Sequence, residues 1–154
     1  MYKLIPHDEL STEGARELTG YLRDDDRLIL ALGNRSKDIS PDDFIAGNAR
    51  WAKDKNADIF YITESGIPIG MISLSKQDPL NRTACVGYWI ASKYWNKGYA
   101  TRAFGDIIEI AREKGFVTLS AKIDRNNVYS LRLWENKGAR KEDRGDMLLV
   151  VLNI

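Results

Sequence analysis

The sequence is poor in the residues that build disulfides and metal centres. Its 154 residues include one cysteine, Cys85, and one histidine, His7. A single cysteine excludes an internal disulfide and a cysteine-rich metal site, so we expect no metal. Basic and acidic residues nearly cancel, 23 against 22, which gives no support for a general nucleic-acid-binding surface. Nucleic acid is therefore not an expected partner.

Long apolar runs are absent as well. No stretch approaches the roughly 20 apolar residues that span a bilayer, and the first ten residues lack a signal-peptide core. We therefore expect no membrane partner and a cytoplasmic location. With 44% hydrophobic and 29% charged residues, the composition is that of a globular chain. Its length suits one domain, 1–154.

Apolar periodicity and turn residues predict an α+β fold with a mixed sheet flanked by helices. Residues 28–32 could form a helix or a strand, because five apolar residues cannot distinguish the two. Pro68 cannot donate to a strand ladder and predicts a bulge or an unpaired position. The expected strands are 2–5, 58–63, 67–74, 84–91, 116–123 and 147–152, and the expected helices are 11–22, one from Pro41, one from Ala100 to about 113, and 128–137.

The clearest element is the strand, turn and helix of residues 84–115. Six apolar residues of the helix share one face: Ala100, Ala103, Phe104, Ile107, Ile108 and Ala111. In the turn before it, Gly98 and the small Ala100 let backbone N–H groups approach a ligand closely. The first N–H groups of a helix lack internal partners and suit a phosphate. Lys97 and Arg102 add positive charge, so the turn predicts an anion site.

The turn matches neither a P-loop nor a dinucleotide-binding loop, because both glycine patterns are absent. Trp95 to Ala100, WNKGYA, instead resembles the [QR]-x-x-G-x-[GA] loop that binds the acyl-CoA pyrophosphate in GCN5-related N-acetyltransferases (GNAT). The surrounding VGYWIASKYWNKGYAT resembles the branch that acetylates ribosomal-protein N-termini. This resemblance implies a GNAT-like, mostly antiparallel central sheet and acetyl-CoA as cosubstrate.

A second motif supports the same family. Residues 127–139, NVYSLRLWENKGA, resemble its N-x-x-[AS]-x-x-x-[YL]-E-K-x-G-F segment, with Asn127, Ser130, Glu135 and Gly138 in register. Asn127 is also placed to cap the helix that begins at Val128. Together the motifs imply a cofactor-binding set of Ile90, Trp95, Asn96, Lys97, Gly98, Tyr99, Ala100, Thr101 and Asn127.

The implied chemistry is acyl transfer from a thioester to an amine. A backbone N–H near Ile90 would stabilise the oxyanion, and an acid must protonate the departing thiolate. The family's usual tyrosine is replaced by Trp134, so the resemblance assigns the acid to Ser130. Three tyrosines are alternatives, Tyr88, Tyr94 and Tyr99. The branch often has Glu where Cys85 stands, so the base stays open, with water or the acceptor-side helices as candidates.

The acceptor is not readable, because the first third of the chain resembles the family least. There Phe44, Trp51 and residues 34–38 are candidates for substrate contact, although core packing is the favoured role for Phe44 and Trp51. We expect His7 on the surface. The predicted function is N-acetyl transfer to a small amine, an aminoglycoside-like compound or a protein N-terminus. The alternative is a catalytically weak acyl-CoA sensor. A homodimer through an edge strand or the last strand stays open.

Overall fold

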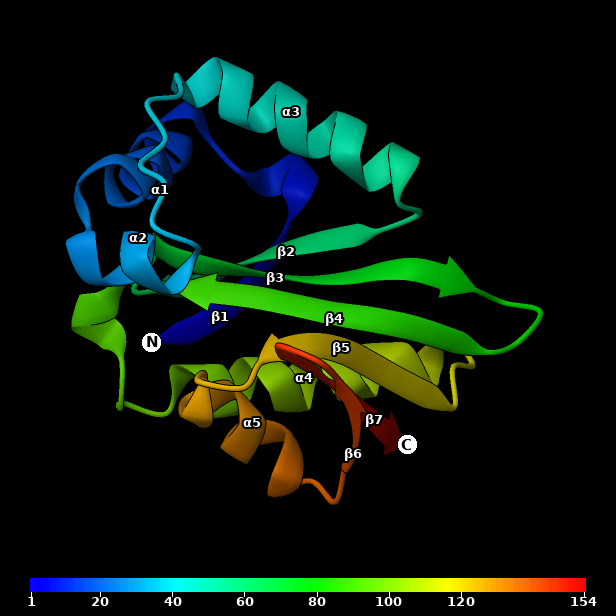
Figure 1. Ribbon diagram of the computed structural model, residues 1–154. Helices are drawn as coiled ribbons and strands as arrows, with labels where there is room; N and C mark the ends of the chain where they lie inside the picture. Colours follow the sequence, from blue (N-terminus) through cyan, green and yellow to red (C-terminus); the bar gives the residue numbers. More distant parts are fainter.

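Seven strands form one twisted sheet in the computed structural model, which describes residues 1–154 (Figure 1). Their order is β1-β2-β3-β4-β5-β7-β6, and every neighbouring pair is antiparallel except β4 and β5. The sheet is therefore mixed and mostly antiparallel, as expected. The strands are β1 Tyr2–Pro6, β2 Asp58–Glu64, β3 Ile67–Asp78, β4 Thr83–Ile90, β5 Thr118–Asp124, β6 Arg140–Arg144 and β7 Met147–Asn153.

Helices cover both faces of the sheet (Figure 1). One face carries α1 Thr12–Asp24, α2 Asp26–Ala31 and α3 Pro41–Asp54, and the opposite face carries α4 Tyr99–Glu113 and α5 Val128–Glu135. Two short 3-10 turns, η1 His7–Glu9 and η2 Ser92–Tyr94, follow β1 and β4. The side chains of Ser11, Asp25, Ser40 and Asn127 cap α1, α2, α3 and α5. None of the helices has the length and apolar character needed to cross a membrane.

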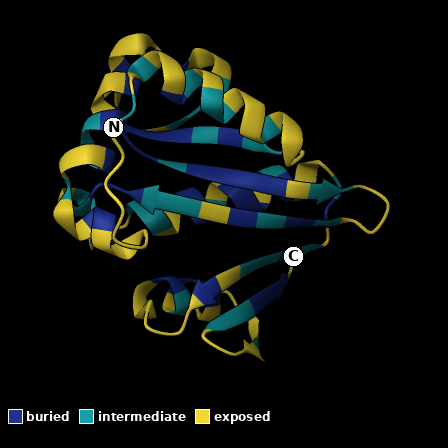
Figure 2. Ribbon diagram, turned by 45° about the horizontal axis from the view of Figure 1, so that its top comes forward, coloured by how far each residue is buried: buried dark blue, intermediate teal, exposed yellow.

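The core lies between the sheet and the helices, where Figure 2 shows the buried residues. Five of the six apolar residues predicted on α4 are buried, and Ala100 is half-buried. Phe104 stacks on Trp134 of α5 with ring centroids 4.7 Å apart. A separate cluster under α1 and α3 contains Phe44, which confirms its predicted core role. The two clusters lie on opposite faces of the sheet and fix the helices against it.

Strands β4 and β5 run in parallel but pair at three positions only, the last being Cys85 with Ser120. Beyond that pair, β4 continues to Ile90 and β5 to Asp124 without pairing to each other. The sheet therefore opens between the two strands toward their C-terminal ends. The bulge predicted at Pro68 is also present, since the β2–β3 register shifts between Ile62 and Thr63.

Three expectations differ from the structure. Strand β6 was not predicted, because each of its five residues is charged and apolar alternation is absent. Trp51 is 37% exposed on α3, so the favoured core role is wrong for it. His7 is half-buried, with Nδ1 2.8 Å from the Tyr61 hydroxyl, so the surface prediction is wrong as well. Asn48 also donates to that hydroxyl, and burial raises the pKa of Tyr61 to about 12.

We predict that Gly70→Ala destabilises the end of β4. A Cβ at this buried position would lie 2.3 Å from the Trp89 carbonyl oxygen and 2.9 Å from the Ile90 Cα. Backbone cannot yield as a flexible side chain does, so we expect a loss of about 1–3 kcal/mol in the free energy of unfolding, measured by urea denaturation.

Gly87→Ala on the neighbouring strand is the matched control. Its Cβ would meet only the Ser73 Oγ, at an ordinary 3.7 Å. We expect stability unchanged or raised by roughly 0.5 kcal/mol. Equal stability of the two variants would contradict the close approach of β3 and β4 at Gly70.

Candidate active site at the parting of β4 and β5

The edge of β4 that faces the opening carries peptide groups without a strand partner. The Ala91 N–H donates to the Ile69 carbonyl on β3 at 2.8 Å. Because peptide groups alternate between the two edges of a strand, those of Tyr88 and Ile90 point to the other edge, where β5 has already diverged. The Ile90 carbonyl accepts there from Trp95 Nε1 at 2.7 Å. The open edge therefore offers the N–H groups of Tyr88 and Ile90.

The predicted anion turn leads directly from β4 to α4. Asn96 and Gly98 adopt left-handed conformations with φ of 60° and 86°, and Gly98 is the N-cap of α4 without any side-chain cap. The first N–H to find a helical partner is that of Arg102, which donates to the Gly98 carbonyl at 3.1 Å. The N–H groups of residues 99–101 thus remain free for a ligand. A Cβ on Gly98 would meet no atom within 4 Å, so the space before the turn is open.

The two cations predicted beside the turn differ in position. Lys97 is exposed, with Nζ 5.9 Å from the Tyr94 ring centroid. The guanidinium of Arg102 instead lies over the ring of Tyr2, 4.1 Å from its centroid. Arg102 is therefore engaged with β1, and Lys97 is the cation of the turn itself.

On the other side of the opening, α5 presents Ser130. Asn127 caps this helix as predicted, because its Oδ1 accepts from the Ser130 N–H at 3.2 Å. The Ser130 side chain is buried, and its Oγ lies 2.8 Å from the Tyr88 hydroxyl of β4. This hydrogen bond joins the two sides of the opening. Burial raises the pKa of Tyr88 above its ordinary value, although the Ser130 bond opposes the shift, so the phenol keeps its proton at neutral pH.

Among the alternative tyrosines, only Tyr88 contacts Ser130. The Tyr99 hydroxyl donates to Oε2 of Glu64, the last residue of β2, at 3.0 Å. Tyr94 packs edge-on against Tyr99, with ring centroids 5.7 Å apart. The sequence identified both partners of the Tyr88–Ser130 pair without identifying the pair, because nothing in their spacing relates a strand to a helix 42 residues later.

Two departures from the family pattern, Trp134 and Cys85, occupy structural positions. Trp134 is 2% exposed and packed on Phe104, so its indole is part of the core. Cys85 is half-buried at the last position where β4 pairs with β5, and its Sγ lies 3.6 Å from the Ser120 Oγ.

Sequence reasoning missed a connection between the acceptor-side helices and the turn. Asp25 caps α2, because its Oδ1 accepts from the Leu28 N–H at 3.3 Å. Both carboxylate oxygens also accept from Ser92, the backbone N–H and the hydroxyl each at 2.7 Å. Burial alone would raise the pKa of Asp25, but these bonds, with Arg27 nearby, outweigh it and hold that pKa below its usual value.

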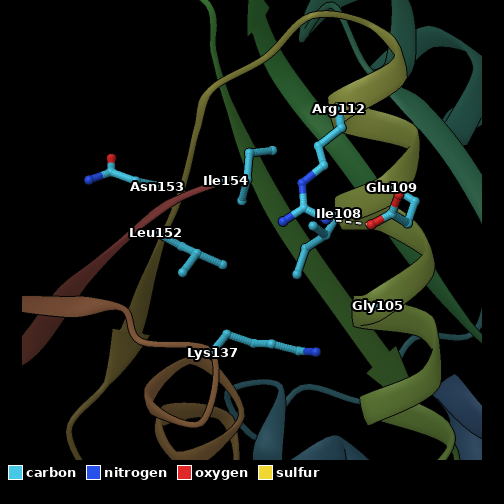
Figure 3. A pocket seen from close by; sticks show the side chains of 8 residues that line it. All are labelled: Gly105, Ile108, Glu109, Arg112, Lys137, Leu152, Asn153 and Ile154. Carbon is cyan, nitrogen blue, oxygen red and sulfur yellow. Dashed lines mark hydrogen bonds and ion pairs between the residues drawn. The ribbon is translucent and has the colours of Figure 1, made fainter.

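A pocket of about 180 Å³ lies apart from the opening, among α4, the turn after α5 and the end of β7 (Figure 3). Arg112 and Lys137 border it over an apolar wall of Ile108 and Leu152, and Arg112 is paired with Glu109. No residue of the site predicted from the sequence lines this pocket. The candidate site is therefore the opening between β4 and β5, with the anion turn at its outer end.

Comparisons with known proteins identify the family of the chain. The family profile described as an acetyltransferase (GNAT) domain matches residues 11–140. A ribosomal-protein-serine acetyltransferase of Escherichia coli (strain K12) is 30% identical over 71 residues. That match covers 46% of this chain and 40% of the relative, so the chain aligns with under half of that protein.

Solved structures share the fold over nearly the whole chain. The microcin C7 self-immunity acetyltransferase MccE, in complex with acetyl-CoA and AMP, superposes with a TM-score of 0.80 at 18% identity, covering 99% of this chain and 92% of its own. RimL, a ribosomal alpha-N-protein acetyltransferase in complex with coenzyme A, gives 0.77 at 16% identity, covering 99% and 94%. At these identities the likeness concerns the fold.

Proposed function

The chain belongs to the acetyltransferase (GNAT) domain family, and we propose that it transfers the acetyl group of acetyl-CoA directly to a primary amine. The observation that carries this proposal is the Tyr88–Ser130 hydroxyl pair at 2.8 Å, set beside the open edge of β4 and continuous with the anion turn. Donors for an oxyanion, an acid and a phosphate site thus border one opening.

The free groups of the opening fit the parts of acyl-CoA. The N–H groups of residues 99–101 and the cation of Lys97 suit the pyrophosphate. Left-handed Gly98 keeps side-chain atoms away from it. The pantetheine arm carries amides, which can pair with the open edge of β4 as a strand would. In this arrangement the thioester reaches the hydroxyl pair.

The protein then contributes to the reaction in three ways: it stabilises the oxyanion, donates a proton and positions the substrates. The neutral amine attacks the thioester carbonyl, and the developing oxyanion accepts from an N–H of the open β4 edge, at Ile90 or Tyr88. As the carbon–sulfur bond breaks, the thiolate takes a proton from the hydroxyl pair. Solvent takes the proton that the acceptor amine loses. Holding both substrates in line supplies much of the rate, so modest acid–base groups suffice.

We assign the acid to Ser130 with Tyr88 as its proton source. An aliphatic hydroxyl is a much weaker acid than a tyrosine phenol, which ordinarily titrates near 10. Burial raises the pKa of Tyr88 above that ordinary value, so the phenol holds its proton until the thiolate forms. When Ser130 gives its proton to the thiolate, Tyr88 can donate to the serine oxygen across the existing hydrogen bond. Proton transfer through the pair leaves the charge on the more acidic group.

For the acceptor, we favour the N-terminus of a protein. The relative from Escherichia coli is named as a ribosomal-protein-serine acetyltransferase, and RimL is named as acting on alpha-amino groups of ribosomal protein. The Asn34-to-Asp38 segment next to α2 is exposed throughout and can meet a macromolecular substrate. Small amines and aminoglycoside-like compounds are the competing acceptors.

We expect the wild-type protein to release free thiol from acetyl-CoA with one class of a panel of N-terminal peptides, polyamines, aminoglycosides and amino acids. A parallel thermal-shift titration with CoA should raise Tm. Stabilisation by CoA without turnover across the panel would favour the acyl-CoA sensor. Absence of stabilisation would contradict both functions.

Lys97→Glu should weaken CoA binding, because it replaces attraction for the pyrophosphate with repulsion. An exposed ion pair contributes up to ~1 kcal/mol, so reversal predicts a loss of roughly 1–2 kcal/mol, or about 5–30-fold in Kd. Isothermal titration calorimetry at low and high salt measures the Kd for CoA. The difference in Kd between the variant and the wild type should be smaller at high salt, because salt screens the charge. Lys53→Glu on α3 is the matched charge reversal and should leave Kd unchanged.

Ser130→Ala should lower kcat by about a hundredfold or more, the usual contribution of a general acid, with the Kd of CoA unchanged. Tyr88→Phe removes the proton source alone, and its kcat should fall to a similar level. In a relay the Ser130→Ala/Tyr88→Phe double variant is no slower than the slower single variant. If the two losses in kcat multiply in the double variant, the relay is refuted. If kcat is unaltered in Ser130→Ala, the assignment of Ser130 as the acid is refuted.

A further inference from the structure

The α1–α2 corner is docked on the segment that connects β4 to the anion turn. Three contacts hold it there. Asp25, between the two helices, accepts twice from Ser92 at 2.7 Å. Arg27 of α2 lies over the Trp95 ring, 4.9 Å from its centroid, and Lys93 lies 5.6 Å from the ring centroid of Tyr21 in α1.

These contacts join opposite faces of the sheet. Segment 91–98 is where the chain crosses from the end of β4 to α4, and α2 lies beside the end of β4 on the other face (Figure 1). The residues that follow α2, 32–38, are exposed. Any shift of the turn at Ser92 is therefore transmitted to α2 through Asp25.

The Asp25 contact is specific in its geometry. One oxygen takes the Ser92 N–H, and the other takes the Ser92 hydroxyl while also capping α2 at Leu28. The neighbouring Asp24 pairs only with Arg23 at the exposed end of α1. Hydrogen bonds to a carboxylate are roughly twice as strong as neutral ones, so this contact can hold two segments in one arrangement.

We propose that Asp25 and Ser92 form a positioning latch that couples the acyl-CoA turn to the acceptor-side helix α2. Occupation of the turn fixes segment 92–98, and the latch passes this order to α2 and the residues that follow it. Because coupling between two sites is reciprocal, an ordered α2 also favours the CoA-binding form of the turn. Acyl-CoA thus prepares the acceptor subsite before the amine arrives. This inference rests on the proposed CoA site.

Hydrogen–deuterium exchange with CoA as the probe tests the latch without a known acceptor. In the wild-type protein, CoA should slow amide exchange at residues 98–101. It should also slow exchange at Ile29 and Leu32 of the α2 region by about fivefold or more, because a factor of about five is the low end of typical coupling between sites. Ser92→Ala keeps the α2 cap and the backbone N–H bond to Asp25 but loses the hydroxyl bond. In this variant the turn should still be protected, and the protection of α2 should be clearly smaller than in the wild type.

Three variants make the outcome specific. Ser92→Thr retains the hydroxyl and should restore α2 protection, whereas Asp24→Ala alters the adjacent carboxylate and should behave as wild type. Asp25→Asn also keeps a capping oxygen for Leu28 and should weaken protection of α2. The latch is overturned if CoA protects the turn but not α2 in the wild-type protein. It is also overturned if α2 is protected equally in Ser92→Ala and in the wild type. No protection of the turn would refute the CoA site instead.

Discussion

The parting of β4 from β5 is the constraint on which the site depends. Parallel pairing lasts for three positions and ends at Cys85 and Ser120. A continuous sheet would satisfy the peptide groups of Tyr88 and Ile90 internally and leave nothing for a ligand. Strand β5 is instead held by β7 along its other edge, from Thr118 to Asp124, so it remains ordered after it leaves β4. The opening is thus a stable feature and not a frayed end.

The parting also explains why the surrounding contacts are polar and precise. Tyr88 and Ser130 meet across the opening at 2.8 Å, where a backbone ladder would otherwise run. Trp95 covers one exposed carbonyl with its indole N–H and packs against hydrophobic clusters on both faces. Below the opening, Phe104 and Trp134 fill the space between α4 and α5. The tryptophan that replaces the expected tyrosine therefore supports the site through packing.

Local physics made most of the elements predictable from sequence. The stripe on α4, the cap at Asn127 and the bulge at Pro68 are set by neighbouring residues, and each was confirmed. Strand β6 was missed because pairing with β7 through the turn at Gly145 overrides its lack of alternation. Trp51 and His7 were misplaced because burial depends on which helix covers which strand. Pairs such as Tyr88 with Ser130 and Asp25 with Ser92 join distant residues, and one sequence carries no signal for them.

The same distinction separates the two halves of the function. In the proposed function, the acyl-CoA side consists of one helix terminus, one left-handed glycine and one strand edge, all within residues 84–101, so a short motif can encode it. In the same proposal, the acceptor side draws on α2 and the residues that follow it, and Asp25 at the start of α2 is bonded to the segment after β4. Those contacts meet the acyl-CoA side at Ser92, two residues after β4 ends and six before the Gly98 cap. If the proposed latch operates, exposed residues of α1 to α3 can vary with the acceptor, provided that the buried cluster of these helices and the carboxylate at Ser92 are kept.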